Sequence, residues 1–137
     1  MYDAHSNITD VTKDGVLQYH YGYDMMNQLV SVDDKLNGKV YNYTYDAGGN
    51  LISETVTDSN GITSNAYEYN NSNWGDVLTS YNGQNITYDE IGNPLTYRDG
   101  MSMTWKNGRQ LATLTNGDTS ISYGYDSDSV RTTKTVN

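Results

Sequence analysis

The sequence contains no cysteine, no phenylalanine and a single proline, Pro94. Without cysteine the chain forms neither a disulfide nor a catalytic thiolate, so both kinds of sulfur chemistry are excluded. No apolar run approaches the roughly 20 residues that a membrane-spanning helix needs. The first residues after Met1 are polar and do not resemble a signal peptide. We therefore expect no membrane span and no cleaved leader within this segment.

Basic residues are also few. Eight lysines and arginines stand against 17 acidic residues, which gives a formal net charge of −9. A surface of this sign repels a phosphate backbone, so we expect no nucleic-acid partner. The simpler interpretation of the charge is that it keeps the chain soluble.

Tyrosine and glycine are abundant instead, with 14 and 13 copies, while hydrophobic residues make up only 35% of the chain. Any core must combine tyrosine rings with Leu, Val and Ile, and each phenol needs a polar partner or water at its tip. This composition predicts thin, half-buried sheets and no deep core. The length of 137 residues suits one domain spanning residues 1–137.

A motif with an aromatic residue before a turn recurs about every twenty residues, in about seven copies. The clearest copy is YTYDAGGNLISET at residues 43–55. The anchoring aromatics are Tyr2, Tyr23, Tyr45, Tyr69, Tyr88, Trp105 and Tyr125. This regular spacing predicts a repeat architecture that occupies nearly the whole chain.

Residues before each anchor alternate between aromatic or apolar and polar types, as at Tyr19, Tyr21 and Tyr23, and this period of two is typical of a strand. Between motif copies lie pairs that favour type I′ hairpin turns, in which both central residues have positive φ. These pairs are Asp14-Gly15, Asn37-Gly38, Asn60-Gly61, Asn82-Gly83, Asp99-Gly100 and Asn116-Gly117. We therefore predict an all-β fold: an antiparallel meander of repeated β-hairpins in a curved or spiralling sheet.

Asp46 is predicted to accept backbone N–H groups within its own turn, where Gly48 and Gly49 provide positive-φ positions and Asn50 tolerates them too. The copies at Tyr69 and Tyr125 depart most from this pattern, because Asn70 replaces the Asp and Ser129-Val130-Arg131 replaces Gly-Asn-Leu. The predicted structural set of the repeat is Tyr2, Asp3, Asn7, Tyr21, Tyr23, Asp24, Tyr43, Tyr45, Asp46, Gly49, Asn50, Leu51, Tyr67, Tyr69, Tyr88, Asp89, Gly92, Asn93, Trp105, Tyr123, Tyr125 and Asp126.

Catalytic and metal-binding patterns are missing from the sequence. His5 and His20 stand in no local Ser/His/Asp or zinc pattern. The segment DSDSVR at 126–131 comes nearest to a calcium loop but lacks its glycine and terminal glutamate. We expect no enzymatic activity, no cofactor and no metal. Trp74 and Trp105 form a candidate platform for a glycan or protein partner, and the simpler alternative assigns such rings to cross-strand packing.

The motif Y-x-Y-D-x-x-G-N-L, seen at 43–51 and again as ITYDEIGNPLTY at 86–97, resembles the YD repeat, also called the RHS repeat. Members of that family form a long β-strip that coils into a hollow shell. The shell encloses a C-terminal toxin in bacterial polymorphic toxins and insecticidal toxin complexes, and similar repeats form the barrel of teneurins. The resemblance implies a non-enzymatic partial shell within a larger secreted or cell-surface bacterial protein. We expect its partners to be neighbouring repeats, or further copies of the chain paired through exposed strand edges.

Overall fold

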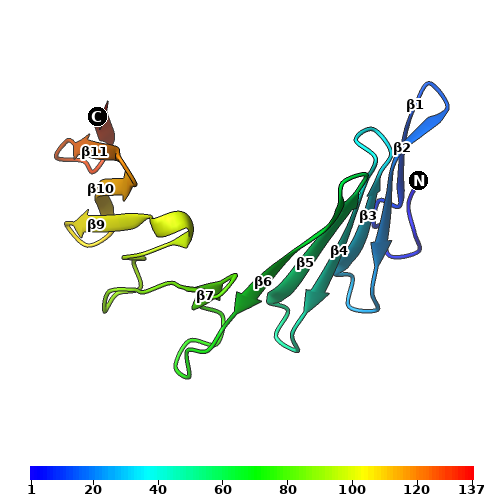
Figure 1. Cartoon of the computed structure of the whole chain (residues 1–137), viewed down its shortest axis with the longest axis horizontal. Coiled ribbons are helices and arrows are strands. Elements are labelled where there is room, and N and C mark those ends of the chain that lie inside the picture. The colour runs from blue at the N-terminus through cyan, green and yellow to red at the C-terminus, as the bar shows by residue number, and fades with distance from the viewer. The chain divides into compact units, whose positions relative to one another are not determined.

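The computed structural model describes all residues, 1–137, and its regular structure is almost entirely β-strand (Figure 1). Contacts within the chain divide it into two compact units, residues 1–68 and residues 69–137. None of its helical segments has the length and apolar character needed to span a membrane. The all-β antiparallel prediction is confirmed.

The first unit contains the first six strands of an eight-stranded sheet, arranged in chain order and each antiparallel to the next (Figure 1). The strands are β1 (Asp10–Lys13), β2 (Val16–Tyr23), β3 (Leu29–Asp34), β4 (Lys39–Tyr45), β5 (Leu51–Asp58) and β6 (Gly61–Glu68). A register shift at Tyr23 and another at Tyr45 mark the ends of β2 and β4. The motif aromatic therefore sits at an irregularity where its strand enters the turn.

The second unit begins with a short hairpin and ends with a four-stranded antiparallel sheet in the order β12-β11-β10-β9. Its elements are β7 (Ser80–Tyr81), β8 (Gln84–Asn85), the 3₁₀ turn η1 (Arg98–Gly100), β9 (Ser102–Lys106), β10 (Gln110–Asn116), β11 (Thr119–Tyr125) and β12 (Arg131–Val136). Between β8 and β9 the pairing is reduced to two isolated bridges, Tyr88 to Pro94 and Thr96 to Ser102. Pro94 has no N–H group to donate to a strand ladder, which favours the loss of regular pairing in this region.

The register places apolar and hydroxyl-bearing residues on opposite faces of the sheet in the first unit. One cross-strand row consists of Tyr21, Val32, Tyr41 and Val56. The neighbouring row, which projects to the other side, consists of Ser31, Asn42, Thr55 and Ser64. Successive residues of a strand point to opposite faces, so the sequence alternation produces this division directly.

The four-stranded sheet of the second unit repeats the arrangement. Its apolar face carries the row Met103, Leu114, Ile121 and Val136. Its hydroxyl face carries the row Thr104, Thr113, Ser122 and Thr135. The hydroxyls of Thr104 and Thr113 lie 2.6 Å apart and bond to each other. Hydroxyl pairs of this kind stabilise neighbouring strands on the face that carries few apolar groups.

No deep core forms, as the composition predicts. Ile86 is the only buried hydrophobic residue, with 5% of its surface exposed. Most tyrosines are half-buried, and only Tyr2 and Tyr97 are exposed. Each unit therefore gains its stability from many partly buried contacts along a sheet.

The Asn-Gly and Asp-Gly pairs all lie in chain reversals, but only half of them have the predicted type I′ geometry. Both residues have positive φ at Asp14-Gly15, Asn82-Gly83 and Asp99-Gly100. Only the glycine does at Asn37-Gly38, Asn60-Gly61 and Asn116-Gly117, so the prediction was wrong there. At Asn37 the cause is Asp34, whose Oδ1 accepts the N–H groups of Leu36 and Asn37, both at 3.1 Å. A side-chain acceptor at the strand end therefore overrides the dipeptide preference.

Candidate functional site

Asp46 organises the turn between β4 and β5. Its Oδ1 accepts the backbone N–H groups of Gly48 at 2.8 Å and Asn50 at 2.9 Å, and its Oδ2 accepts the side-chain amide of Asn50 at 2.9 Å. The N–H of Asp46 donates to the carbonyl of Asn50, and the N–H of Gly49 donates to the carbonyl of Asp46. Gly49 has a φ of +88°, a conformation that glycine adopts without steric penalty, whereas Gly48 does not have positive φ and the prediction was wrong there. We call this arrangement the Asp turn.

Four further motif copies form the same Asp turn, at Asp3, Asp24, Asp89 and Asp126. In each, the carboxylate accepts the N–H groups two and four residues ahead. The residue three ahead always has positive φ, and it is Ser6, Asn27 or Ser129 where glycine is absent. The Asp turn therefore forms even in the divergent copy at Tyr125.

At Asp46 and Asp3 the bonds of the Asp turn favour the ionised carboxylate. The side-chain amide of Asn50, followed by the backbone N–H of the same residue, lowers the pKa of Asp46. The side-chain amide of Asn7 lowers the pKa of Asp3 in the same way. An ionised carboxylate lacks the proton of a general acid, and both oxygens of Asp46 already accept hydrogen bonds within its own turn. These aspartates are arranged to hold turns.

Four of the anchoring tyrosines bond to the preceding repeat through their hydroxyl groups. The hydroxyl of Tyr45 donates to the carbonyl oxygen of Leu29 at 2.7 Å. Equivalent bonds join Tyr23 to Ile8, Tyr88 to Leu78 and Tyr125 to Leu111. We call these bonds aromatic stitches. Phenylalanine has no donor for such a bond, which gives a physical reason for tyrosine at this position.

Trp105 forms an aromatic stitch in the copy where it replaces tyrosine. Its indole Nε1–H donates to the carbonyl of Pro94 at 2.7 Å, and its ring is half-buried in register with Leu111. The turn after it differs from the Asp turn, because Asn107 and Gly108, with φ of +47° and +84°, close a shorter loop. The polar tip of Trp105 is therefore engaged within the sheet.

The other tyrosines of the predicted set lie in or beside the sheets. Tyr21 stacks on Tyr19, with ring centroids 6.1 Å apart and planes inclined by 20°. Tyr43 pairs in register with Glu54, and burial together with the negative charge of Glu54 raises the pKa of Tyr43. Of the remaining members, Tyr2 is bridged to Ile8, Leu51 pairs with Tyr45, Tyr67 lies in β6, Tyr69 begins the second unit and Tyr123 lies in β11.

Basic side chains cover several tyrosine rings in the second unit, and these contacts were not predicted from the sequence. Lys106 lies 5.2 Å from the ring centre of Tyr125, and Arg131 lies 5.3 Å from that of Tyr123. Arg131 pairs in register with Tyr125 and so stands diagonal to Tyr123. The strand register would have identified that pair, because diagonal neighbours lie within reach of long side chains.

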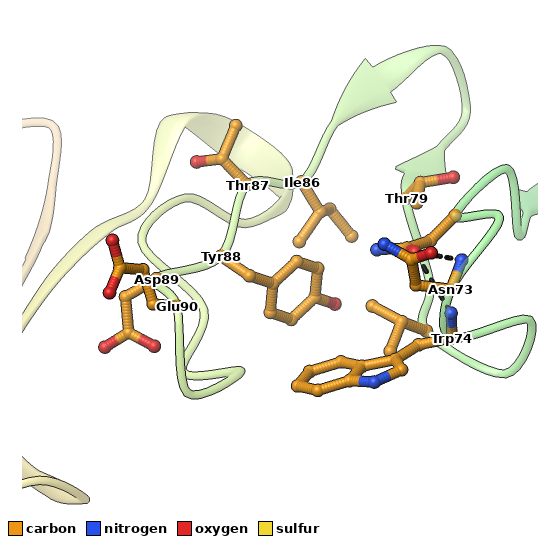
Figure 2. Close-up of a pocket in the computed structure, with 10 residues that line it drawn as sticks. Asn73, Trp74, Thr79, Ile86, Thr87, Tyr88, Asp89 and Glu90 are labelled. Atoms are coloured by element: carbon orange, nitrogen blue, oxygen red, sulfur yellow. Dashed lines mark hydrogen bonds between the residues drawn. The ribbon is translucent and has the colours of Figure 1, made fainter.

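A hollow of about 540 Å³ lies beside the Asp turn of Asp89 in the second unit. Figure 2 shows the indole of Trp74 below the ring of Tyr88, with Asn73 at one side and Glu90 at the other. Its lining residues are Asn71, Asn73, Trp74, Val77, Thr79, Ile86, Thr87, Tyr88, Asp89 and Glu90. We call this pocket the Trp74 hollow. Trp74 itself is 47% exposed.

Trp74 is positioned by a turn that was not predicted from the sequence. The Oδ1 of Asn71 accepts the N–H groups of Asn73 at 2.9 Å and Trp74 at 3.0 Å. The carbonyl of Trp74 then accepts the N–H of Val77 at 3.0 Å. A Cβ added to Gly92 would lie 2.7 Å from the Trp74 ring, so glycine lets the indole pack against the next turn. An asparagine-centred turn thus replaces the Asp turn in the divergent copy at Tyr69.

His20 lies beside a carboxylate, but the arrangement is not that of a catalytic triad. Its Nδ1 is 2.8 Å from Oδ1 of Asp10, and Oδ2 of Asp10 accepts the hydroxyl of Thr9 at 3.1 Å. In a triad the imidazole stands between hydroxyl and carboxylate, whereas here the carboxylate stands between the other two. His5 donates its backbone N–H to Asp3. No three His, Asp or Glu side chains gather as a metal site would require.

These observations define a class of protein: a repeat protein of single-layer antiparallel sheets, with Asp turns and aromatic stitches. The family model described as Teneurin YD-shell matches residues 1–137. The chain belongs to this YD-shell family, which confirms the resemblance inferred from the motifs.

Two curated relatives match over 120 residues, or 84% of this chain. The chain is 37% identical to the "tRNA3(Ser)-specific nuclease WapA" of Bacillus spizizenii (strain DSM 15029 / JCM 12233 / NBRC 101239 / NRRL B-23049 / TU-B-10). It is 36% identical to the "tRNA nuclease WapA" of Bacillus subtilis (strain 168). The match spans only 5% of the length of each relative.

Proposed function

We propose that this chain is a non-enzymatic wall segment of a bacterial YD shell. The wall belongs to a larger secreted or surface-attached protein and helps to enclose a toxin carried by that protein. The observation that carries the proposal is the self-contained bonding of the repeat: both oxygens of Asp46 are bonded in its own turn, and the hydroxyl of Tyr45 is bonded in the preceding repeat. The match of a shell family to all of residues 1–137 supports it.

The names of the two relatives support the toxin context. The match covers 5% of their length, and we propose that any nuclease of the larger protein lies outside this segment. The net charge of −9 also disfavours binding of tRNA by the wall itself. The purified 137-residue chain should therefore leave tRNA intact. Cleavage that persists through purification and disappears with His20→Ala would overturn the non-enzymatic role.

The containment role is tested in the full-length protein with its natural flanks. We expect the region downstream of the repeats to resist protease in the wild type. Gly49→Val, which strains an Asp turn, should expose that region, whereas Thr57→Ala on an exposed position of β5 should not. Equal protease sensitivity of the downstream region in all three proteins would refute containment.

Neighbouring repeats are the partners in this proposal. Strand β12 pairs with β11 on one side, and its six residues are all exposed. An edge of this kind pairs readily with another strand. In the isolated chain the same edge should pair with a second copy, so sedimentation at increasing concentration should show association. A contact with a Kd of about 1 mM is half-populated at about that concentration. A strictly monomeric species at about 1 mM would therefore contradict association through the β12 edge.

A further inference from the structure

We propose that the Trp74 hollow is a binding site for a neutral sugar residue. The inference goes beyond the wall function and does not depend on it, since all the residues involved lie in the second unit. Its volume of about 540 Å³ falls within the roughly 300–1,000 Å³ typical of ligand pockets. Such pockets combine apolar walls with a few polar groups that orient the ligand.

The aromatic part of the site is Trp74. Trp74 is 47% exposed and its indole lines the hollow, where an apolar C–H face of a pyranose can pack against it (Figure 2). Trp105 does not offer this surface, because its ring is half-buried and its N–H already donates to Pro94. The sequence makes both tryptophans candidates for a ligand platform, whereas the structure leaves only Trp74 accessible for this role.

The polar groups around Trp74 determine the ligand class. The side chains of Asn73 and Glu90 make no hydrogen bond within the chain, and Asn71 uses only its Oδ1, so its NH₂ group remains available. The hollow therefore offers both donors and acceptors. Sugar hydroxyls use both, whereas an ammonium group has no acceptor for the amide N–H groups.

Charge excludes the acidic sugars. The carboxylate of Glu90 lines the hollow, and the chain carries a net charge of −9. An anionic saccharide would approach this surface against electrostatic repulsion. A neutral hexose or N-acetylhexosamine unit can pack on the Trp74 ring and also form hydrogen bonds with the amides and with the Glu90 carboxylate. We therefore infer this class of ligand.

The test uses the 137-residue chain and the indole N–H resonances of its two tryptophans. The probes are neutral oligomers of glucose, galactose and N-acetylglucosamine, with heparin and polygalacturonate as anionic probes. We expect at least one neutral oligomer to shift the Trp74 resonance saturably, with a Kd of about 0.1–10 mM for so open a site. No shift with any neutral oligomer up to about 30 mM, or stronger binding of the anionic probes, would overturn the proposal.

Variants locate the site and fix the ligand class. Trp74→Ala should weaken neutral-sugar binding at least about tenfold, while Ile91→Ala, exposed on the adjacent turn outside the lining, should leave it unchanged. Glu90→Gln should retain binding of the neutral sugar, and its complete loss would point to a cationic ligand instead. If Trp74→Ala disturbs the fold of the second unit, Asn73→Ala removes only exposed polar atoms and should still weaken binding several-fold. Unchanged binding in Asn73→Ala or Trp74→Ala refutes the site.

Discussion

Replacing Tyr45 by phenylalanine tests the aromatic stitch that joins one repeat to the next. The change removes the hydroxyl that donates to the carbonyl of Leu29 at 2.7 Å and leaves the ring in place. A hydrogen bond of this type contributes about 0.5–1.5 kcal/mol net, so the free energy of unfolding should fall by about 1 kcal/mol. In a unit of 68 residues this lowers Tm by roughly 4–8 °C.

Tyr43→Phe is the matched control. Tyr43 lies on the same strand and the same face two residues earlier, and its hydroxyl makes no hydrogen bond in the structure. Its replacement should change stability by no more than about 0.5 kcal/mol. Urea unfolding followed by circular dichroism compares the two variants, with equal m-values required for the comparison. Equal losses in both, or no loss in Tyr45→Phe, would refute the stabilising role of the stitch.

Three further predictions concern the turn and the pH dependence. Gly49→Val forces a β-branched residue to a φ of +88° and should cost about 1–3 kcal/mol, against about 0.5 kcal/mol or less for Thr57→Ala; equal Tm values would contradict the turn assignment. Folding lowers the pKa of Asp46, so the ionised carboxylate stabilises the folded state fully at pH values above the unfolded pKa of about 3.9. This stabilisation is lost as the pH falls through the lower pKa of the folded state, and a Tm independent of pH between about 5 and 2 would argue against the role of Asp46. Burial raises the pKa of Tyr43 and of Tyr88, so stability should fall as pH rises above about 10, and less steeply in Tyr43→Phe than in the wild type.

Strand order and strand type could be predicted because they depend on local pattern. The alternation at Tyr41, Tyr43 and Tyr45 specifies one strand with one apolar face, and the next strand in the sequence is always its partner. The prediction did not have to choose between strands that lie far apart in the sequence, because each strand pairs with its neighbours in the chain. Turn geometry was less predictable, since Asn37 responds to a carboxylate three residues earlier that competes with the Asn-Gly preference.

The aromatic stitches and the Trp74 hollow could not be predicted from the sequence for a different reason. The acceptor for Tyr45 is a backbone carbonyl 16 residues earlier, and a carbonyl leaves no mark on residue identity. Trp74 and Trp105 differ only in what surrounds them: a turn organised by Asn71 holds the first, and register along β9 directs the second toward Pro94. Both outcomes depend on three-dimensional neighbours, which periodicity does not encode.

The purely sequential pairing of strands has a consequence for folding. Within each unit a strand meets only the strands just before and just after it, and the stitches reach back only 10 to 16 residues. Closing such short loops costs little entropy, and folds with local contacts form quickly. Each new repeat can therefore add to the one already made, so the wall can grow from its N-terminal end while the chain emerges from a ribosome or an export channel. The absence of cysteine means that no oxidation step interrupts this growth.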